Sequence, residues 1–133
     1  MPAMQDPLPR AIATFAVIQL VVVGLSHVFQ PRTWVRFFTV LHAHGHAGVL
    51  VHGFLSLWFG SLILAFHHAW SGLPLVLTIT GCLYLVKAVA CFLVPESQMR
   101  TLSRVAEERA WELRVPGIVY LVVAGATAWS LWG

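Results

Sequence analysis

Residues 42–70 read HAHGHAGVLVHGFLSLWFGSLILAFHHAW, and this stretch decides the fold. From Ala47 to Phe66 the residues are almost wholly apolar. At about 1.5 Å of rise per residue, a helix over this run would be roughly 30 Å long, which matches the hydrocarbon core of a bilayer. The stretch therefore predicts a membrane-spanning helix. All of the histidines except His27 lie in or beside it.

The composition of the whole chain is also that of a membrane protein. Hydrophobic residues make up 59% and charged residues 10% of the 133 residues, and the mean hydropathy is +0.81. Soluble domains carry about 25% charged residues. Too few polar side chains are therefore present to cover a water-facing surface, and we expect the lipid bilayer to be the main partner. The small net charge of +3 comes from arginines beside apolar runs, so we expect no nucleic-acid binding.

Three further apolar runs accompany the first, which predicts an all-α, integral membrane four-helix bundle in a single domain over residues 1–133. Residues 1–10 are expected to be a poorly ordered tail. Between the spans, arginines alternate with apolar residues or apolar residues recur at helical spacing, which predicts two amphipathic interfacial segments. The expected spans are residues 11–29, 45–66, 75–94 and 115–132, and the amphipathic segments are residues 32–41 and 96–114.

The arginines predict the orientation of the chain in the membrane. Apart from Arg10, every arginine lies in the segments that follow the first and third spans. The positive-inside rule places such segments in the cytoplasm. We therefore expect a multi-pass protein with both termini outside the cytoplasm.

A weak internal repeat is visible in the sequence. The first and third spans each end at a proline, Pro31 and Pro95, and each is followed by an arginine-bearing amphipathic segment and a glycine-containing span. Two such hairpins in the same orientation would form a parallel repeat. The alternative is that any four-span protein with two cytoplasmic loops has this appearance.

A lysine and a histidine are predicted to lie inside the membrane at similar depth. Lys87 precedes Pro95 by eight residues, and His52 lies eight residues inside the second span, so both lie roughly 12 Å from the same face. An unpaired lysine there costs about 2.5–3.5 kcal/mol on insertion scales. Lys87 would therefore donate to His52, Ser56 or backbone carbonyls, or bind an anionic ligand. The alternative is that its stem carries the ammonium out to the headgroups.

The histidines near the expected cytoplasmic face are candidate metal ligands. His42 and His46 are four residues apart, which on one helix would place them on one face, where they could chelate a metal ion with His27. A haem would need ligands on two helices, and His27 with His46 is the available pair. The alternative is that these imidazoles are only solvated at the interface.

The loop between the second and third spans holds a further group of candidates. It contains His67, His68 and Trp70 at the expected external interface. Interfacial tryptophans commonly anchor a span at the headgroup level, which is the simplest interpretation of Trp70.

Several function classes lack their residues in this chain. The sequence has no Ser-His-Asp set, no glycine-rich phosphate loop and no Cys-x-x-Cys motif, so we predict no catalytic residues, no enzyme activity and no cofactor other than a metal ion. The expected spans contain no acidic residue, which argues against a proton- or cation-coupled carrier of the carboxylate kind.

From the second span to Pro95, the sequence resembles a family of small, uncharacterised bacterial inner-membrane proteins with a His-Asn-x-Trp outer loop, an intramembrane lysine and Pro-Glu after the third span. The matching residues are Pro31, Gly53, Gly60, His67, Trp70, Thr78, Gly81, Lys87, Pro95 and Glu96. This sequence departs from the pattern at His68, where the family has Asn, and at Cys82, where it has Trp. The resemblance implies a bacterial inner membrane and a shared role for His67, Trp70 and Lys87, and it implies no activity.

Three functions follow as hypotheses. The first is a small accessory or assembly subunit that binds other membrane proteins or lipids. The second is an oligomeric small transporter or channel, with His52 and Lys87 in an anion-binding pocket. The third is a metal- or haem-binding membrane protein that uses His27, His42 and His46.

Overall fold

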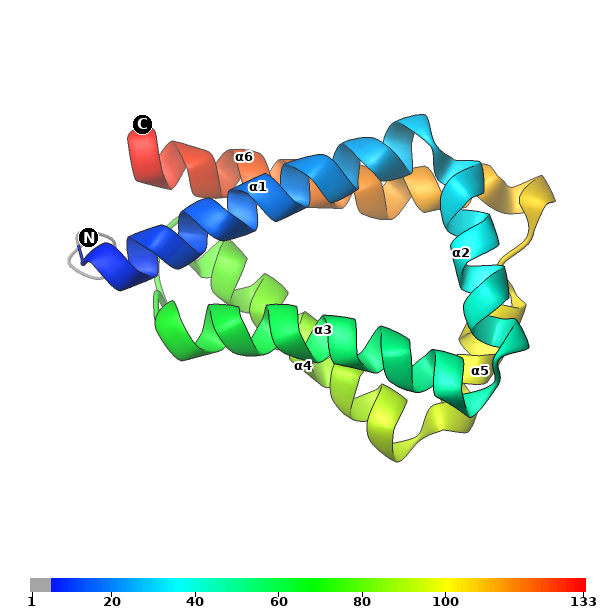
Figure 1. Ribbon diagram of the computed structural model, residues 1–133. Coiled ribbons are helices and arrows are strands. Elements are labelled where there is room, and N and C mark those ends of the chain that lie inside the picture. Colours follow the sequence, from blue (N-terminus) through cyan, green and yellow to red (C-terminus); the bar gives the residue numbers. More distant parts are fainter. Residues whose placement is uncertain (1–5) are drawn as a thin grey trace.

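The computed structural model describes residues 6–133, which form helices and no strand (Figure 1). Four segments are long and apolar enough to cross a membrane: α1, α3, α4, and η2 together with α6. The all-α four-span prediction is therefore confirmed. The elements are α1 (Pro7–Phe29), α2 (Pro31–Ala43), α3 (His46–Phe66), α4 (Leu75–Leu93), α5 (Pro95–Ser103), the 3-10 helix η2 (Glu107–Leu113) and α6 (Arg114–Trp132).

Prolines begin α1, α2 and α5 and explain where these helices start. Proline suits the first helical turn because its missing N–H would have no partner there. The residues before Pro31 and Pro95 leave helical geometry in the same way, with φ/ψ of -129°/53° at Gln30 and -134°/61° at Val94. Each proline thus separates a spanning helix from a helix that crosses the end of the bundle.

The four spans form two close-packed, antiparallel pairs, α1 with α6 and α3 with α4 (Figure 1). Glycines let the backbones in each pair approach closely. A Cβ on Gly24 would lie 3.0 Å from the carbonyl oxygen of Gly117, and one on Gly60 would lie 2.9 Å from that of Gly81. The two pairs are therefore rigid units, whereas α1 packs much less extensively against α3, and α4 against α6.

The two pairs meet at the end that carries the chain termini and diverge toward the other end (Figure 1). At the terminal end, one apolar core joins all four spans through side chains that include Ala16, Leu20, Ile63, Leu77 and Val123. At the opposite end, α2 and α5 bridge the divergent pairs. We call this the arginine-rich end, because α2, α5, η2 and the residues between α5 and η2 hold Arg32, Arg36, Arg100, Arg104 and Arg109.

A second apolar core holds the bridge in place. It contains Leu41 of α2, Val49 of α3, Cys91 of α4 and Leu102 of α5, all buried. These four residues come from four consecutive helices of the described chain. The core therefore ties α2 and α5 to the α3–α4 pair and keeps α2 across the arginine-rich end.

The structure favours the internal repeat. Pro31 and Pro95 are 64 residues apart along the chain, and the same spacing relates the helix contacts. A Cβ on Gly117 would lie 2.6 Å from Cβ of His27, and a Cβ on Gly53 would lie 2.7 Å from Cβ of Cys91. Both members of the second contact are offset by 64 residues from their counterparts. The segments α1–α2–α3 and α4–α5–η2–α6 therefore share a similar order of elements and this helix contact, as the two halves of a parallel repeat would.

Several predicted boundaries need correction. Helix α1 begins at Pro7, so residues 7–10 are its first turn and not a tail, while the expectation for residues 1–5 falls outside the described residues. The single amphipathic helix expected over residues 96–114 is two pieces, because the backbone at Ala106 is extended (φ -146°, ψ 152°). The guanidinium of Arg109 donates to the carbonyl of Arg104, which satisfies a carbonyl that the helix would otherwise use.

The loop between α3 and α4 is held by two buried side chains. His67 is 1% exposed, and its Nε2 donates to the carbonyl oxygen of Pro74 at 3.0 Å. Thr78 is also buried, and its Oγ1 donates to the carbonyl oxygen of Ala69 at 2.7 Å. The second bond gives the Ala69 carbonyl a partner, and the first adds to the Thr78 N–H that also reaches the Pro74 carbonyl, at 3.4 Å.

We expect Gly53→Ala and Gly117→Ala to lower the thermal unfolding midpoint of the detergent-purified protein, because each added methyl would overlap a Cβ of the neighbouring helix. Overpacking of this kind costs about 1–3 kcal/mol. Gly125→Ala is the matched control, because nothing lies within 4 Å of a Cβ there. Equal midpoints for all three variants would contradict the packing described.

We expect His67→Ala to destabilise the protein by about 0.5–1.5 kcal/mol, because it removes a buried hydrogen bond to the Pro74 carbonyl. The neighbouring His68→Ala should have little effect, because His68 is exposed. Thermal unfolding of both variants in the same detergent measures the difference. A midpoint for His67→Ala equal to that of His68→Ala would show that the loop bond does not contribute.

Candidate functional site

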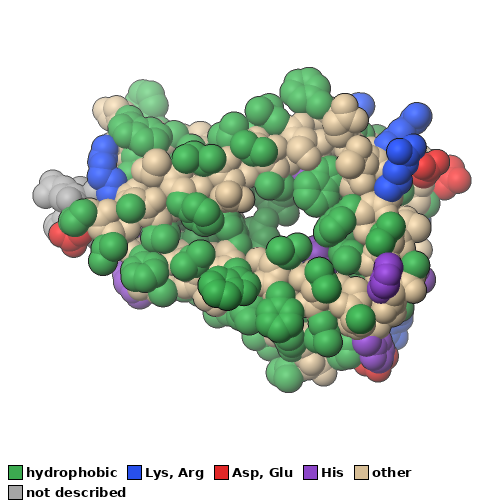
Figure 2. Space-filling view, in the orientation of Figure 1, with side chains coloured by type: hydrophobic (Ala, Val, Ile, Leu, Met, Phe, Trp, Pro, Cys, Tyr) green, Lys and Arg blue, Asp and Glu red, His purple; other side chains and the backbone are tan. Residues whose placement is uncertain are grey.

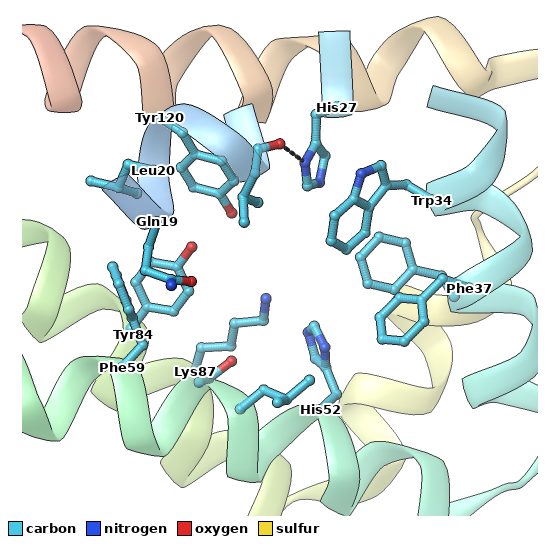
Figure 3. A pocket seen from close by; sticks show the side chains of 14 residues that line it. Gln19, Leu20, His27, Trp34, Phe37, His52, Phe59, Tyr84, Lys87 and Tyr120 are labelled. Carbon is cyan, nitrogen blue, oxygen red and sulfur yellow. Dashed lines mark hydrogen bonds between the residues drawn. The ribbon is translucent and has the colours of Figure 1, made fainter. Parts of the chain in front are cut away.

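A cavity of about 270 Å³ lies where the two helix pairs diverge (Figure 3). Helices α1, α2, α3, α4 and α6 all contribute to its lining. The terminal-end core closes it on one side, and α2 covers it on the arginine-rich side. The cavity therefore follows from the fold, because close packing within each pair and divergence between pairs leave space that no backbone fills.

Lys87 of α4 points into this cavity (Figure 3). Its Nζ lies 5.9 Å from the ring centroid of Tyr84, one turn earlier on the same helix. Among the described residues that line the cavity, none is acidic. Within residues 6–133, the ion pair found joins His46 and Glu96 at 3.7 Å, and none reaches Lys87. The ammonium group thus has an aromatic face beside it and no counter-ion.

His52 of α3 lines the same cavity as Lys87 (Figure 3). Its ring is half-buried and makes an edge contact with Phe38, with ring centroids 5.5 Å apart. The structure therefore brings together the two residues whose similar depth the sequence indicated. The alternative, in which the Lys87 stem runs out toward the headgroups, does not match its direction in the structure.

His27 of α1 also lines the cavity, and its side chain is 4% exposed. Its Nδ1 lies 2.9 Å from the carbonyl oxygen of Val23. A carbonyl only accepts, so Nδ1 carries the hydrogen and Nε2 stays free for other partners. The ring stacks on Trp34 with centroids 4.0 Å apart, and the Trp34 Nε1 donates to the hydroxyl of Ser26.

Helix α2 closes the cavity with aromatic side chains. Trp34, Phe37 and Phe38 are half-buried and line it from the arginine-rich side. From the sequence, residues 32–41 are predicted to lie in the membrane interface. Part of the apolar face of α2 instead packs onto the protein. Trp34, Phe37 and Phe38 recur at intervals of three and four residues, so they share one helix face, and this pattern could have indicated that the face is covered by protein.

Of the remaining polar groups, the sequence indicated Ser56 as a possible partner of Lys87, whereas Gln19, Tyr84 and Tyr120 were not singled out. Ser56 of α3 and the phenols Tyr84 and Tyr120 line the cavity, as does Gln19 of α1. The rings of Tyr84 and Tyr120 are stacked with centroids 6.2 Å apart and so link α4 to α6. A serine or a tyrosine in an apolar run is common, so only the tertiary arrangement distinguishes these residues.

The repeat shows how the cavity became asymmetric. Lys87 corresponds to Val23 at the 64-residue offset, and Tyr120 corresponds to Ser56. All four residues line the cavity. The two halves therefore provide equivalent positions, and the second half carries the only permanent charge among the described lining residues.

The other predicted ligand-binding residues lie elsewhere. His67 and Trp70 belong to the α3–α4 loop at the terminal end, and neither lines the cavity. His67 is buried and bonded to the loop, whereas Trp70 is 67% exposed, as an interfacial anchor would be. The structure therefore does not bring these two residues together with Lys87 and His52.

The three candidate metal ligands are not assembled either. The described residues hold no group of three or more His, Cys, Asp or Glu side chains that could bind a metal ion. His42 and His46 do not share a helix face, because α2 ends at Ala43 and Gly45 has a φ of 61° before α3 begins. His27 lies in the cavity, while His46 pairs with Glu96 at the arginine-rich end.

Comparisons of the chain with protein-family models, with curated proteins and with solved structures find no match. The resemblance to a bacterial inner-membrane family therefore stays a prediction. The four candidate spans support a small, multi-pass integral membrane protein in contact with the lipid bilayer.

Proposed function

We propose that this chain is a non-enzymatic membrane protein that binds an anion in the cavity between its two helix pairs. One observation carries the proposal: Lys87 points into the cavity, and no described lining residue is acidic. The proposal keeps the anion-binding pocket of the second hypothesis. It concerns binding of the anion only and makes no statement about transport.

The energy of an unpaired charge supports this proposal. Transfer of an ammonium from water into a low-dielectric interior costs several kcal/mol unless a partner compensates it. Helices α1, α3, α4 and α6 contain no carboxylate that could do so. A bound anion would supply the missing charge, and the cation–aromatic contact with Tyr84 is too weak to replace it.

The groups around Lys87 are suited to hold such a ligand. The phenols of Tyr84 and Tyr120 and the hydroxyl of Ser56 can each donate a hydrogen bond to an oxygen atom in the cavity. His52 can donate from one ring nitrogen. Charge-assisted bonds to an ionised acceptor are about twice as strong as neutral ones, which favours a carboxylate or phosphate over a neutral ligand.

The other hypotheses have less support. A metal ion bound by His27 in the cavity would share that space with the Lys87 ammonium, which repels it, and the other candidate ligands, His42 and His46, lie outside the cavity. An accessory subunit or a homo-oligomer would bury an apolar face of the spans, but exposed apolar side chains there suit lipid equally well. These hypotheses stay predictions.

We expect a carboxylate or phosphate to raise the thermal unfolding midpoint of the wild-type protein, and Lys87→Met to abolish this shift. The probes are acetate, dodecanoate and inorganic phosphate. Loss of a hydrogen-bonded charge contact of about 1.5–3 kcal/mol should weaken binding roughly tenfold to a hundredfold. Lys87→Arg should retain most of the binding, and Arg100→Met, on exposed α5, is the charge-matched control. Failure of all three probes to shift the wild type would refute the proposal.

We expect the ligand-free Lys87→Met variant to be more stable than the ligand-free wild type, by about 1–3 kcal/mol, because an uncompensated charge is replaced by an apolar side chain of similar length. The free energy of unfolding in detergent, titrated with a denaturing detergent, measures this difference. A less stable variant would indicate that Lys87 serves the fold and not a ligand.

A further inference from the structure

The cavity opens sideways between α1 and α3. Gln19 of α1 and Leu55 of α3 both line the cavity and are both exposed on the outer face of the spans, Leu55 by 58%. Figure 2 shows the surface hollowed between these helices, with a histidine side chain at the edge of the hollow. We call this the lateral opening.

The lateral opening lies at the middle of the membrane. Gln19 is near the centre of α1 (Pro7–Phe29), and Leu55 is near the centre of α3 (His46–Phe66). A polar amide on a lipid-facing surface at this depth is costly unless it has a partner. The amide of Gln19 could give a polar head group a hydrogen bond as that group passes through the opening.

Apolar side chains lie between the cavity and each end of the bundle. On the arginine-rich side, Trp34, Phe37 and Phe38 of α2 cover it. At the terminal end, the core that contains Leu20 and Ile63 joins the two helix pairs. The lateral opening therefore connects the cavity to the hydrocarbon region, where only a ligand that dissolves in the bilayer is abundant.

We propose that the occupant is a single-chain fatty carboxylate, which enters from the bilayer and places its head group on Lys87 while its tail leaves between α1 and α3. This inference rests on the proposed anion-binding function and names its ligand class. Lys87 is the only lining residue with a permanent charge among those described, so a monoanion matches the site. A doubly charged phosphate would leave one charge uncompensated.

The size of the cavity agrees with this occupant. Its volume is about 270 Å³. This space suits a carboxylate and the first few carbons of a chain, and it is too small for an entire lipid. The aromatic lining from Phe59, Tyr84 and Trp34 would contact those first carbons, and the remaining tail would stay in lipid.

The test measures binding of radiolabelled straight-chain carboxylates, from acetate to dodecanoate, to the protein in lipid nanodiscs. The signal of Lys87→Met is subtracted, so that only Lys87-dependent binding is counted. Affinity, expressed against the aqueous concentration, should rise about fourfold with each added methylene, because the tail leaves water for lipid. Dodecylammonium, with the opposite charge, should show no Lys87-dependent binding.

A variant at the lateral opening tests the route. Leu55→Trp should weaken dodecanoate binding by about tenfold or more, because the larger ring obstructs the path of the tail. Leu83→Trp is the matched control, since Leu83 is 64% exposed on α4 and does not line the cavity. The chain-length series needs no variant, so the inference remains testable if Leu55→Trp does not fold.

The outcomes separate the two proposals. If acetate binds as tightly as dodecanoate and Leu55→Trp changes nothing, the ligand comes from water, and the fatty-carboxylate inference is wrong while the anion pocket stands. If inorganic phosphate binds in a Lys87-dependent manner and no carboxylate does, the same conclusion holds. If no anion shows Lys87-dependent binding, both proposals fail.

Discussion

The close approach of helix backbones at glycines is the constraint on which the rest of this structure depends. Gly24 meets Gly117, and Gly60 meets Gly81, at distances where an added Cβ would overlap the neighbouring helix. In lipid, where the hydrophobic effect does not drive helices together, such contacts provide much of the packing energy. They create two rigid pairs. Because the pairs are joined mainly at one end, the other end must be bridged, and a cavity remains between them.

The 64-residue offset relates the two halves of the cavity lining. Two units offset by 64 residues provide the same framework, including matched glycine contacts at Gly53 and Gly117. Positions that are equivalent at this offset, Val23 with Lys87 and Ser56 with Tyr120, all line the cavity. Lys87 corresponds to Val23, so one charge arises on one side of a nearly symmetric site. The stability of the bundle and the chemistry of the cavity therefore reside in different residues.

Much of the fold was readable from the sequence, because spans are set by length and hydropathy. The four spans, the prolines that end two of them and the interior position of Lys87 followed from these properties. The break at Ala106 was missed, since periodicity continues through it while the backbone does not. The prediction that His42 and His46 share a helix face was also wrong, because Gly45, with its positive φ, lies between two separate helices.

The sequence by itself determined that this is an all-α membrane protein with an ionisable residue inside a span, because the bilayer imposes helix length, apolar composition and a cost on charge. Only the tertiary structure decided which residues meet that charge. Side chains of His27, Trp34 and Tyr120 converge on Lys87 from helices far apart in the chain. The reason is that hydropathy reports the depth of a residue in the membrane, whereas the rotation of each helix about its axis is set by packing against its neighbours.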